Sequence, residues 1–205
     1  VLEKAGVPTR LAVPHKAFNR QIGALAGIKM SPDGRVVSEA EWTARKAEWL
    51  PTPEDFAFAL AQLRNEPFIG FDTESKPCFT SDAPRTGPHV LQFATREQAF
   101  IVQLNNDPPL DFLREVIESP HMVKVGFGLK SDRGPLQRKL GLQLGASIDL
   151  ATGMRKLGYK QAVGVRTAVA IALGRRLHKA KSATTSNWAA INLSEGQVQY
   201  AGEDA

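Results

Sequence analysis

The sequence FIGFDTE at residues 68–74 decides the fold, because a short apolar run of this kind predicts a buried β-strand. Side chains two residues apart in a strand project from the same face, so Asp72 and Glu74 emerge together at the end of the strand. Two buried carboxylates are costly unless a cation joins them. Hard divalent ions such as Mg²⁺ or Mn²⁺ prefer carboxylate oxygen, which makes the pair a candidate metal bracket, although isolated Asp-x-Glu pairs are common by chance.

The segments around this strand alternate between apolar runs and helical patterns. They predict further strands at 90–94, 99–104, 122–127 and 147–150, and helices between Thr52 and Pro67, at 110–117, around 132–136 and after Ser194. The first two of these strands are joined by four polar residues, which favours a hairpin. Adjacent early strands followed by β-α-β alternation predict an α/β fold with a mixed central sheet flanked by helices.

The composition is that of one ordinary globular domain. The chain has 205 residues, of which 42% are hydrophobic and 23% charged, and its single cysteine, Cys78, excludes an internal disulfide. The longest apolar run, 168–173, is far shorter than the ~20 residues that a membrane span needs. We therefore expect a protein of the cytoplasm that makes no membrane contact. Because the chain starts at Val1 rather than Met, we also expect a fragment or a trimmed chain.

Residues 1–50 give few signals of structure or function, whereas residues 51–205 give many. The first range is expected to be an N-terminal helical extension to which the sequence assigns no role. Its strongest signal is the pair Trp42 and Trp49, whose spacing of seven predicts one helical stripe used for packing. The second range holds the strands and acidic residues and is expected to be the functional domain.

Charge is unevenly distributed along the chain. The net charge is +5, yet residues 150–194 contain no Asp or Glu and eight of the 26 Lys and Arg residues. Such one-sided placement favours a surface for polyanions, of which phosphate backbones are the usual ones. A solvated face without a partner explains the charge alone equally well.

Further acidic residues stand at the ends of predicted elements. Asp132 follows the 122–127 strand, where a helix begins. Tyr200 and Asp204 are four apart on the last helix, which Ser194 and Gln197 open with a capping-box pattern. A spacing of four places the phenol and the carboxylate on one helical face. Asp149, by contrast, is interpreted as a structural cap.

Three segments together resemble the motifs of the DEDD 3′–5′ exonucleases. They are 71–74 (FDTE), 125–132 (VGFGLKSD) and 200–205 (YAGEDA). The tyrosine four residues before the last aspartate matches the DEDDy subclass, which includes ribonuclease D and the Werner-type exonuclease domain. The resemblance covers about 67–205, including the segment 181–194 before the third motif.

The resemblance implies an RNase H-like fold and two-metal hydrolysis of phosphodiester bonds with Mg²⁺ or Mn²⁺. It implies that Asp72 bridges both ions, that Glu74 and Asp204 complete the hydrolytic one, and that Asp132 acts largely through water. It also implies that Tyr200 orients the attacking water, since a pKa near ~10 makes tyrosine a poor base at neutral pH. Four carboxylates would balance the charge of two divalent ions.

The basic stretch then becomes a candidate track for phosphates, which would make binding salt-dependent. Its proposed contacts are Arg175, Arg176, Lys179 and Lys181. Trp188 is a candidate for base stacking, with a structural plug beside the Tyr200 helix as the favoured interpretation. Phe79 and His89, in the loop after the first core strand, are candidate contacts to the terminal nucleotide.

Two features depart from the family pattern. Gly128 stands four before Asp132, where relatives often have asparagine, which affects a substrate contact rather than the metal ligands. The chain also stops one residue after Asp204, and because helix ends fray we expect that a C-terminal segment is missing.

Three functions remain open at this stage. The first is a 3′–5′ exonuclease on single-stranded DNA or DNA 3′ ends that releases nucleoside 5′-monophosphates. The second is ribonuclease D-like trimming of RNA 3′ ends with the same site, and the third is a catalytically silent nucleic-acid-binding module. DNA is the favoured substrate, the presence of all the site carboxylates counts against the silent module, and the sequence identifies no protein partner.

Overall fold

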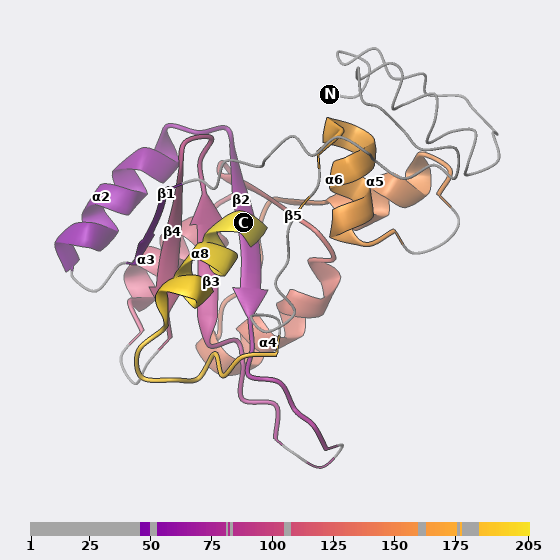
Figure 1. Cartoon of the computed structure of the whole chain (residues 1–205). Helices are drawn as coiled ribbons and strands as arrows, with labels where there is room; N and C mark the ends of the chain where they lie inside the picture. The colour runs from indigo at the N-terminus through magenta and orange to yellow at the C-terminus, as the bar shows by residue number, and fades with distance from the viewer. Residues whose placement is uncertain are drawn as a thin grey trace. The chain divides into compact units, whose positions relative to one another are not determined.

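A six-stranded mixed β-sheet forms the centre of the chain, as the computed structural model shows (Figure 1). The structure describes residues 46–49, 53–80, 82, 84–104, 108–159, 163–175, 177 and 185–205. The strand order is β1-β4-β3-β2-β5-β6. The strands are β1 (Lys46–Trp49), β2 (Phe68–Glu74), β3 (Val90–Ala94), β4 (Gln98–Gln103), β5 (Val123–Gly126) and β6 (Ser147–Asp149).

Strand direction confirms the mixed sheet. The β2, β3 and β4 strands pair antiparallel as consecutive hairpins, whereas β5 pairs parallel to β2, and β6 parallel to β5. The parallel pairs follow helical crossovers, because parallel neighbours need a long connection that returns the chain to the same edge. This topology places the ends of β2 and β5 side by side.

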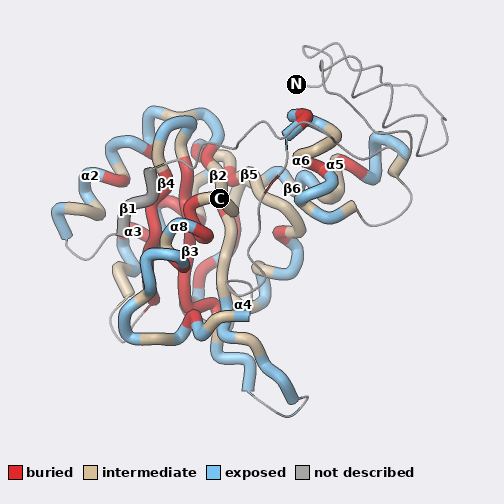
Figure 2. The backbone as a smooth tube through the Cα atoms, in the orientation of Figure 1, coloured by how far each residue is buried: buried red, intermediate tan, exposed pale blue. Residues whose placement is uncertain are grey.

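The central strands β3 and β4 are buried along almost their whole length (Figure 2), and their apolar residues divide between two clusters on opposite faces of the sheet. Ile69 and Phe71 of β2 face one side, where they pack against three helices. These are α2 (Pro53–Arg64), α3 (Leu110–Ile117) and α4 (Lys130–Leu140). The other face carries a smaller cluster under α8 (Glu195–Asp204), in which Trp188 and Tyr200 pack on β3 and β4. The strands and helices predicted within 53–204 all form, with ends shifted by a few residues.

The prediction of one helix that carries both Trp42 and Trp49 is wrong for the residues that lead up to Trp49. Residues Lys46–Trp49 form strand β1, parallel to β4, and Trp42 lies outside the described residues. The unpaired backbone groups at the sheet edge favour strand pairing there, which overrides a weak helical period. The sheet therefore includes residues that the sequence assigns to the N-terminal extension.

The chain divides into two compact units, 44–150 with 179–205 and 1–43 with 151–178. The described helices of the second unit are α5 (Leu150–Lys156), which starts at the last residue of the first unit, and α6 (Val165–Leu173). Gly174 ends α6 in the left-handed conformation that favours glycine, with φ of 63°. No helix among the described residues combines the length and the apolar character that a membrane span requires.

Candidate active site

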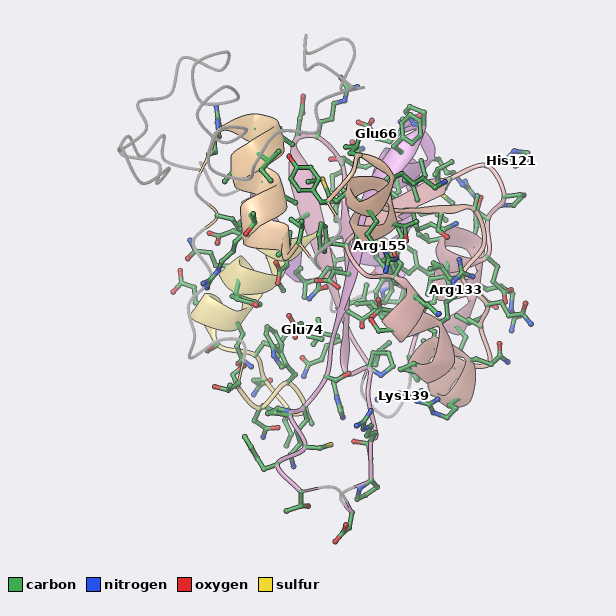
Figure 3. The ribbon with its side chains drawn as sticks, turned by 90° about the vertical axis from the view of Figure 1, so that its right-hand side faces the viewer. Glu66, Glu74, His121, Arg133, Lys139 and Arg155 are labelled. Carbon is green, nitrogen blue, oxygen red and sulfur yellow. The ribbon has the colours of Figure 1, made fainter. Side chains whose placement is uncertain are left out.

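Three carboxylates that are far apart in the sequence meet at the end of β2. Asp72, Glu74 and Asp204 each offer an oxygen, and these oxygens lie within 4.8 Å of one another. All three side chains are half-buried. Glu74, labelled in Figure 3, is the last residue of β2, whereas Asp204 is the last residue of α8. An all-oxygen donor set with three negative charges fits a hard divalent cation.

The cluster forms because α8 is held at its start and lies close to β2 at its end. At the start, the Ser194 hydroxyl accepts a hydrogen bond from the Gln197 backbone N–H, and the Gln197 side chain accepts one from the Ser194 backbone N–H. The predicted capping box is thus confirmed. At the end, a Cβ atom on Gly70 would lie 2.6 Å from the carbonyl carbon of Ala205. Only glycine lets the two backbones approach so closely.

Tyr200 lies one turn before Asp204 and is nearly buried. Its ring packs on Trp188, with 5.9 Å between ring centroids. Trp188 is itself fully buried, so no face of its indole is free to stack on a base. The favoured interpretation of Trp188 as a structural plug therefore agrees with its burial.

Asp132 lies at the same strand end but not within the group of three. Its Oδ1 accepts a hydrogen bond from the Thr73 hydroxyl at 2.6 Å. Thr73 faces the side of β2 opposite to Asp72 and Glu74, because side chains alternate along a strand. Burial raises the pKa of the Asp132 carboxyl, and the charge of Asp149 acts in the same direction, against the hydrogen bond from Thr73.

The loop between β5 and α4 brings Asp132 to this position. A Cβ atom on Gly126 would lie 2.3 Å from the Phe71 carbonyl oxygen, so β5 approaches β2 more closely than a larger residue allows. Gly128 has a φ of 85°, and its backbone N–H donates to Asp149 Oδ1 at 2.9 Å. This hydrogen bond gives Asp149 the structural role that the sequence predicts.

The loop from 75 to 89 carries the two predicted nucleotide contacts. Phe79 is 84% exposed. His89 is buried, its Nδ1 accepts from the Lys76 backbone N–H at 3.1 Å, and its Nε2 lies 3.1 Å from the Thr86 hydroxyl. Burial lowers the pKa of His89, and the charges of Lys139 and Lys76 lower it further. Both ring nitrogens of His89 thus have partners in the protein, which favours a structural role over nucleotide binding.

The proposed phosphate track lies largely outside the described residues. Arg175 is exposed after α6, while Arg176, Lys179 and Lys181 are not described. Their predicted contacts to phosphate stay predictions.

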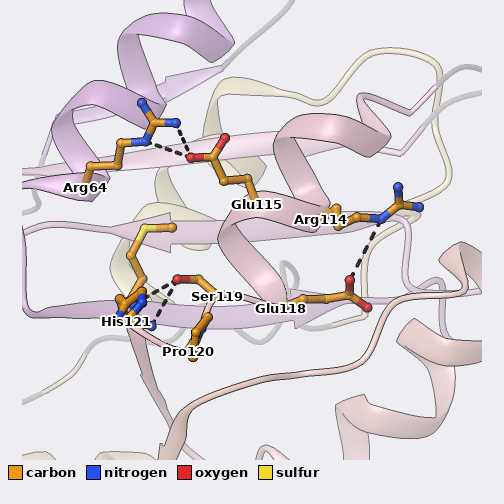
Figure 4. A pocket seen from close by; sticks show the side chains of 8 residues that line it. Arg64, Arg114, Glu115, Glu118, Ser119, Pro120 and His121 are labelled. Carbon is orange, nitrogen blue, oxygen red and sulfur yellow. Dashed lines mark hydrogen bonds and ion pairs between the residues drawn. The ribbon is translucent and has the colours of Figure 1, made fainter.

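A groove of about 490 Å³ lies beside α3, away from the motif residues (Figure 4). Arg64 donates to Glu115 there, and Arg114 forms an ion pair with Glu118 at 3.8 Å. The charges that line it are paired with one another, and it contains none of the clustered carboxylates. We therefore assign the candidate site to the end of β2.

Comparison with known proteins agrees with this assignment. Residues 47–205 match the model of a family described as 3′–5′ exonuclease. DNA polymerase I of Aquifex aeolicus is 29% identical over 77% of this chain and 25% of its own. Ribonuclease D of Gluconacetobacter diazotrophicus is 28% identical over 76% of this chain and 38% of its own. Benzoyl-CoA oxygenase component B of Aromatoleum evansii is 52% identical over only 25% of this chain and 11% of its own, too little to indicate a function.

The fold itself also has solved counterparts. The crystal structure of Escherichia coli RNase D superposes with a TM-score of 0.67 and 21% identity, over 78% of this chain and 41% of that one. This likeness shows the RNase H-like fold that the sequence predicts. The chain spans less than two fifths of each curated relative named above. On the match to residues 47–205 and the motifs within them, the chain belongs to the DEDD-type 3′–5′ exonuclease family.

Proposed function

We propose that this chain is a metal-dependent exonuclease that removes nucleotides from nucleic-acid 3′ ends and releases nucleoside 5′-monophosphates. The observation that supports it is the meeting of Asp72, Glu74 and Asp204 oxygens within 4.8 Å. These residues come from the first and third motifs, which lie far apart within the family match. DNA is the first proposed substrate, and the single cysteine accords with the cytoplasmic location that we expect.

Each side chain has a distinct part in the proposal. Asp72, Glu74 and Asp204 would hold two divalent ions, Mg²⁺ or Mn²⁺, with Asp132 contributing through water. When bound, such ions supply Lewis acidity for attack on phosphorus and for departure of the leaving oxygen. The Tyr200 hydroxyl would orient the attacking water without removing its proton. The exposed ring of Phe79 would stack on the terminal base, a contact that tolerates any sequence.

RNA trimming is the second candidate, and the likeness to ribonuclease D favours it. Identity to that enzyme and to DNA polymerase I is almost equal, at 28% and 29%. Carboxylates do not distinguish the two substrates, because discrimination depends on contacts to the 2′-OH.

The decisive experiment uses 5′-labelled DNA and RNA oligonucleotides with Mg²⁺, Mn²⁺ or EDTA. We expect a metal-dependent ladder that shortens from the 3′ end, and loss of the ladder in Asp72→Ala. Asp111→Ala, an exposed acid in the first turn of α3, is the matched control and should retain the ladder. A ladder that survives EDTA would contradict the mechanism. Binding without any ladder would favour the silent module instead.

A further inference from the structure

Gln92 lies at the centre of the sheet, next to the acidic site. It pairs with Asp72 of β2 on one side and with Ile101 of β4 on the other. Residues directly opposite each other in an antiparallel pair have Cβ atoms about 4.5–5.5 Å apart and share a face. The side chain of Gln92 therefore lies on the same face of the sheet as the Asp72 carboxylate.

The neighbours of Gln92 in β3 show which face this is. Leu91 and Phe93 belong to the apolar cluster under α2 and α3, whereas Val90 belongs to the cluster with Trp188 and Tyr200. Gln92 thus points toward α8, into a region otherwise filled by apolar and aromatic side chains. It is fully buried there.

The amide of Gln92 has no hydrogen-bond partner. Both its Oε1 and its Nε2 are buried and unpaired, and among the described residues it is the only amide side chain with both atoms in this state. Lys124 and Gln197 are buried but satisfied: the Lys124 ammonium group donates to the Ser119 and Met122 carbonyls, and the Gln197 amide donates to the Ser186 hydroxyl. The other described side chains with a buried, unpaired polar atom have only one such atom each, among them the Trp188 indole. A buried amide without partners is unfavourable, so its presence calls for a bound group or a function.

We infer that Gln92 is a positioning residue for the acidic site, in which its Nε2 donates to the Asp72 carboxylate directly or through one buried water. The inference rests on the proposed function. A rotation about the side chain or a bridging water suffices, given the distance between the two positions. A neutral donor orients the carboxylate without adding a positive charge that would compete with the metal ions.

The test separates metal binding from stability. Gln92→Met keeps the approximate volume but removes the polar atoms, so the variant should melt at or above the temperature of the wild type. Its affinity for Mn²⁺ alone, measured by electron paramagnetic resonance, should nevertheless fall about tenfold, and kcat should fall with it while KM changes little. Gln98→Met is the matched control: the Nε2 of Gln98 is also buried and unpaired, but Gln98 begins β4, away from Asp72. Its Mn²⁺ affinity should not change.

A second variant covers the case in which Gln92→Met does not fold. Gln92→Asn keeps the amide but withdraws it by one carbon–carbon bond, and it should also weaken Mn²⁺ binding. Wild-type Mn²⁺ affinity and kcat in the folded variants would overturn the inference and leave the proposed function intact. Failure of the wild-type protein to bind Mn²⁺ would overturn both.

Discussion

Replacement of Gly70 by alanine tests whether the approach of α8 to β2 sets the activity. The added Cβ would lie 2.6 Å from the carbonyl carbon and 3.0 Å from the carbonyl oxygen of Ala205, and 3.2 Å from the Cβ of Ala94. Ordinary contacts begin at 3.4 Å, so the end of α8 must retreat by roughly 0.8 Å. Asp204 is the neighbour of Ala205 and would move with it.

The expected effect on activity is much larger than that on stability. Catalytic groups need placement within about 0.5 Å, and a displacement of about 1 Å can cost on the order of 100-fold in rate. Overpacking costs about 1–3 kcal/mol of unfolding free energy, partly offset because glycine is unfavourable within a strand. We therefore expect Gly70→Ala to lose one to two orders of magnitude in kcat, with weaker Mn²⁺ binding and only a few degrees in Tm.

Gly196→Ala is the control within the same helix. A Cβ at this position meets nothing within 4 Å, and alanine stabilises a helix relative to glycine by about 1 kcal/mol. The control should keep wild-type kcat and melt slightly higher. The reasoning is refuted if Gly70→Ala cleaves labelled oligonucleotides at the wild-type rate, because the close approach would then have no bearing on Asp204.

Three further predictions concern the surroundings of the site. Burial raises the pKa of the Asp132 carboxyl in the folded state above its ordinary 3.8. The folded protein then holds this proton at pH values where the unfolded chain has lost it. The free energy of unfolding that this group contributes is therefore fully present at acid pH and is lost as pH rises through the raised pKa. Asp132→Asn in EDTA should therefore melt above the wild type at pH 7 but not at pH 3, as calorimetry across this range would show; a pH-independent difference would contradict the assignment. Trp188→Ala should cost about 3–5 kcal/mol in denaturant unfolding and should also lower kcat, because Tyr200 loses its packing partner; an unchanged midpoint would argue against a buried plug. Double replacement of Lys179 and Lys181 by glutamine should reduce the salt slope of single-strand binding by about 1.4, measured by fluorescence anisotropy, and an unchanged slope would place the phosphate track elsewhere.

The elements that the sequence predicts well are those with strong local signals. The run at 68–74 forms β2, and Ser194 with Gln197 opens α8. In each case the pattern depends on residues close together in the chain. The position of Asp204 beside β2 could be expected only from the resemblance to a family, because local patterns do not fix distances across the fold.

The features that the sequence does not indicate depend on tertiary contacts. Strand β1 is short and takes its hydrogen bonds from β4, so nothing within 46–49 distinguishes it from a helix turn. The hydrogen bond from Thr73 to Asp132 joins residues 59 apart in the chain. The role of Gly70 likewise depends on the distant Ala205. The period of a strand shows which face a side chain takes, but not which atoms it meets there.

The three clustered carboxylates come from a strand and a helix, and these two elements hold them in different ways. Asp72 and Glu74 lie opposite Gln92 and Val90 of β3, so the ladder with that strand holds their backbone, whereas the pairing of β2 with β5 covers only residues 68–70. Asp204 lies on α8, which belongs to no ladder, so its place at the site is set by how the helix packs on the sheet. That packing includes the buried residues Ala201 and Gly202, the ring of Tyr200 on Trp188, and the close approach of Ala205 to Gly70. Trp188, although fully buried, thus contributes to the geometry of the site through its contact with α8.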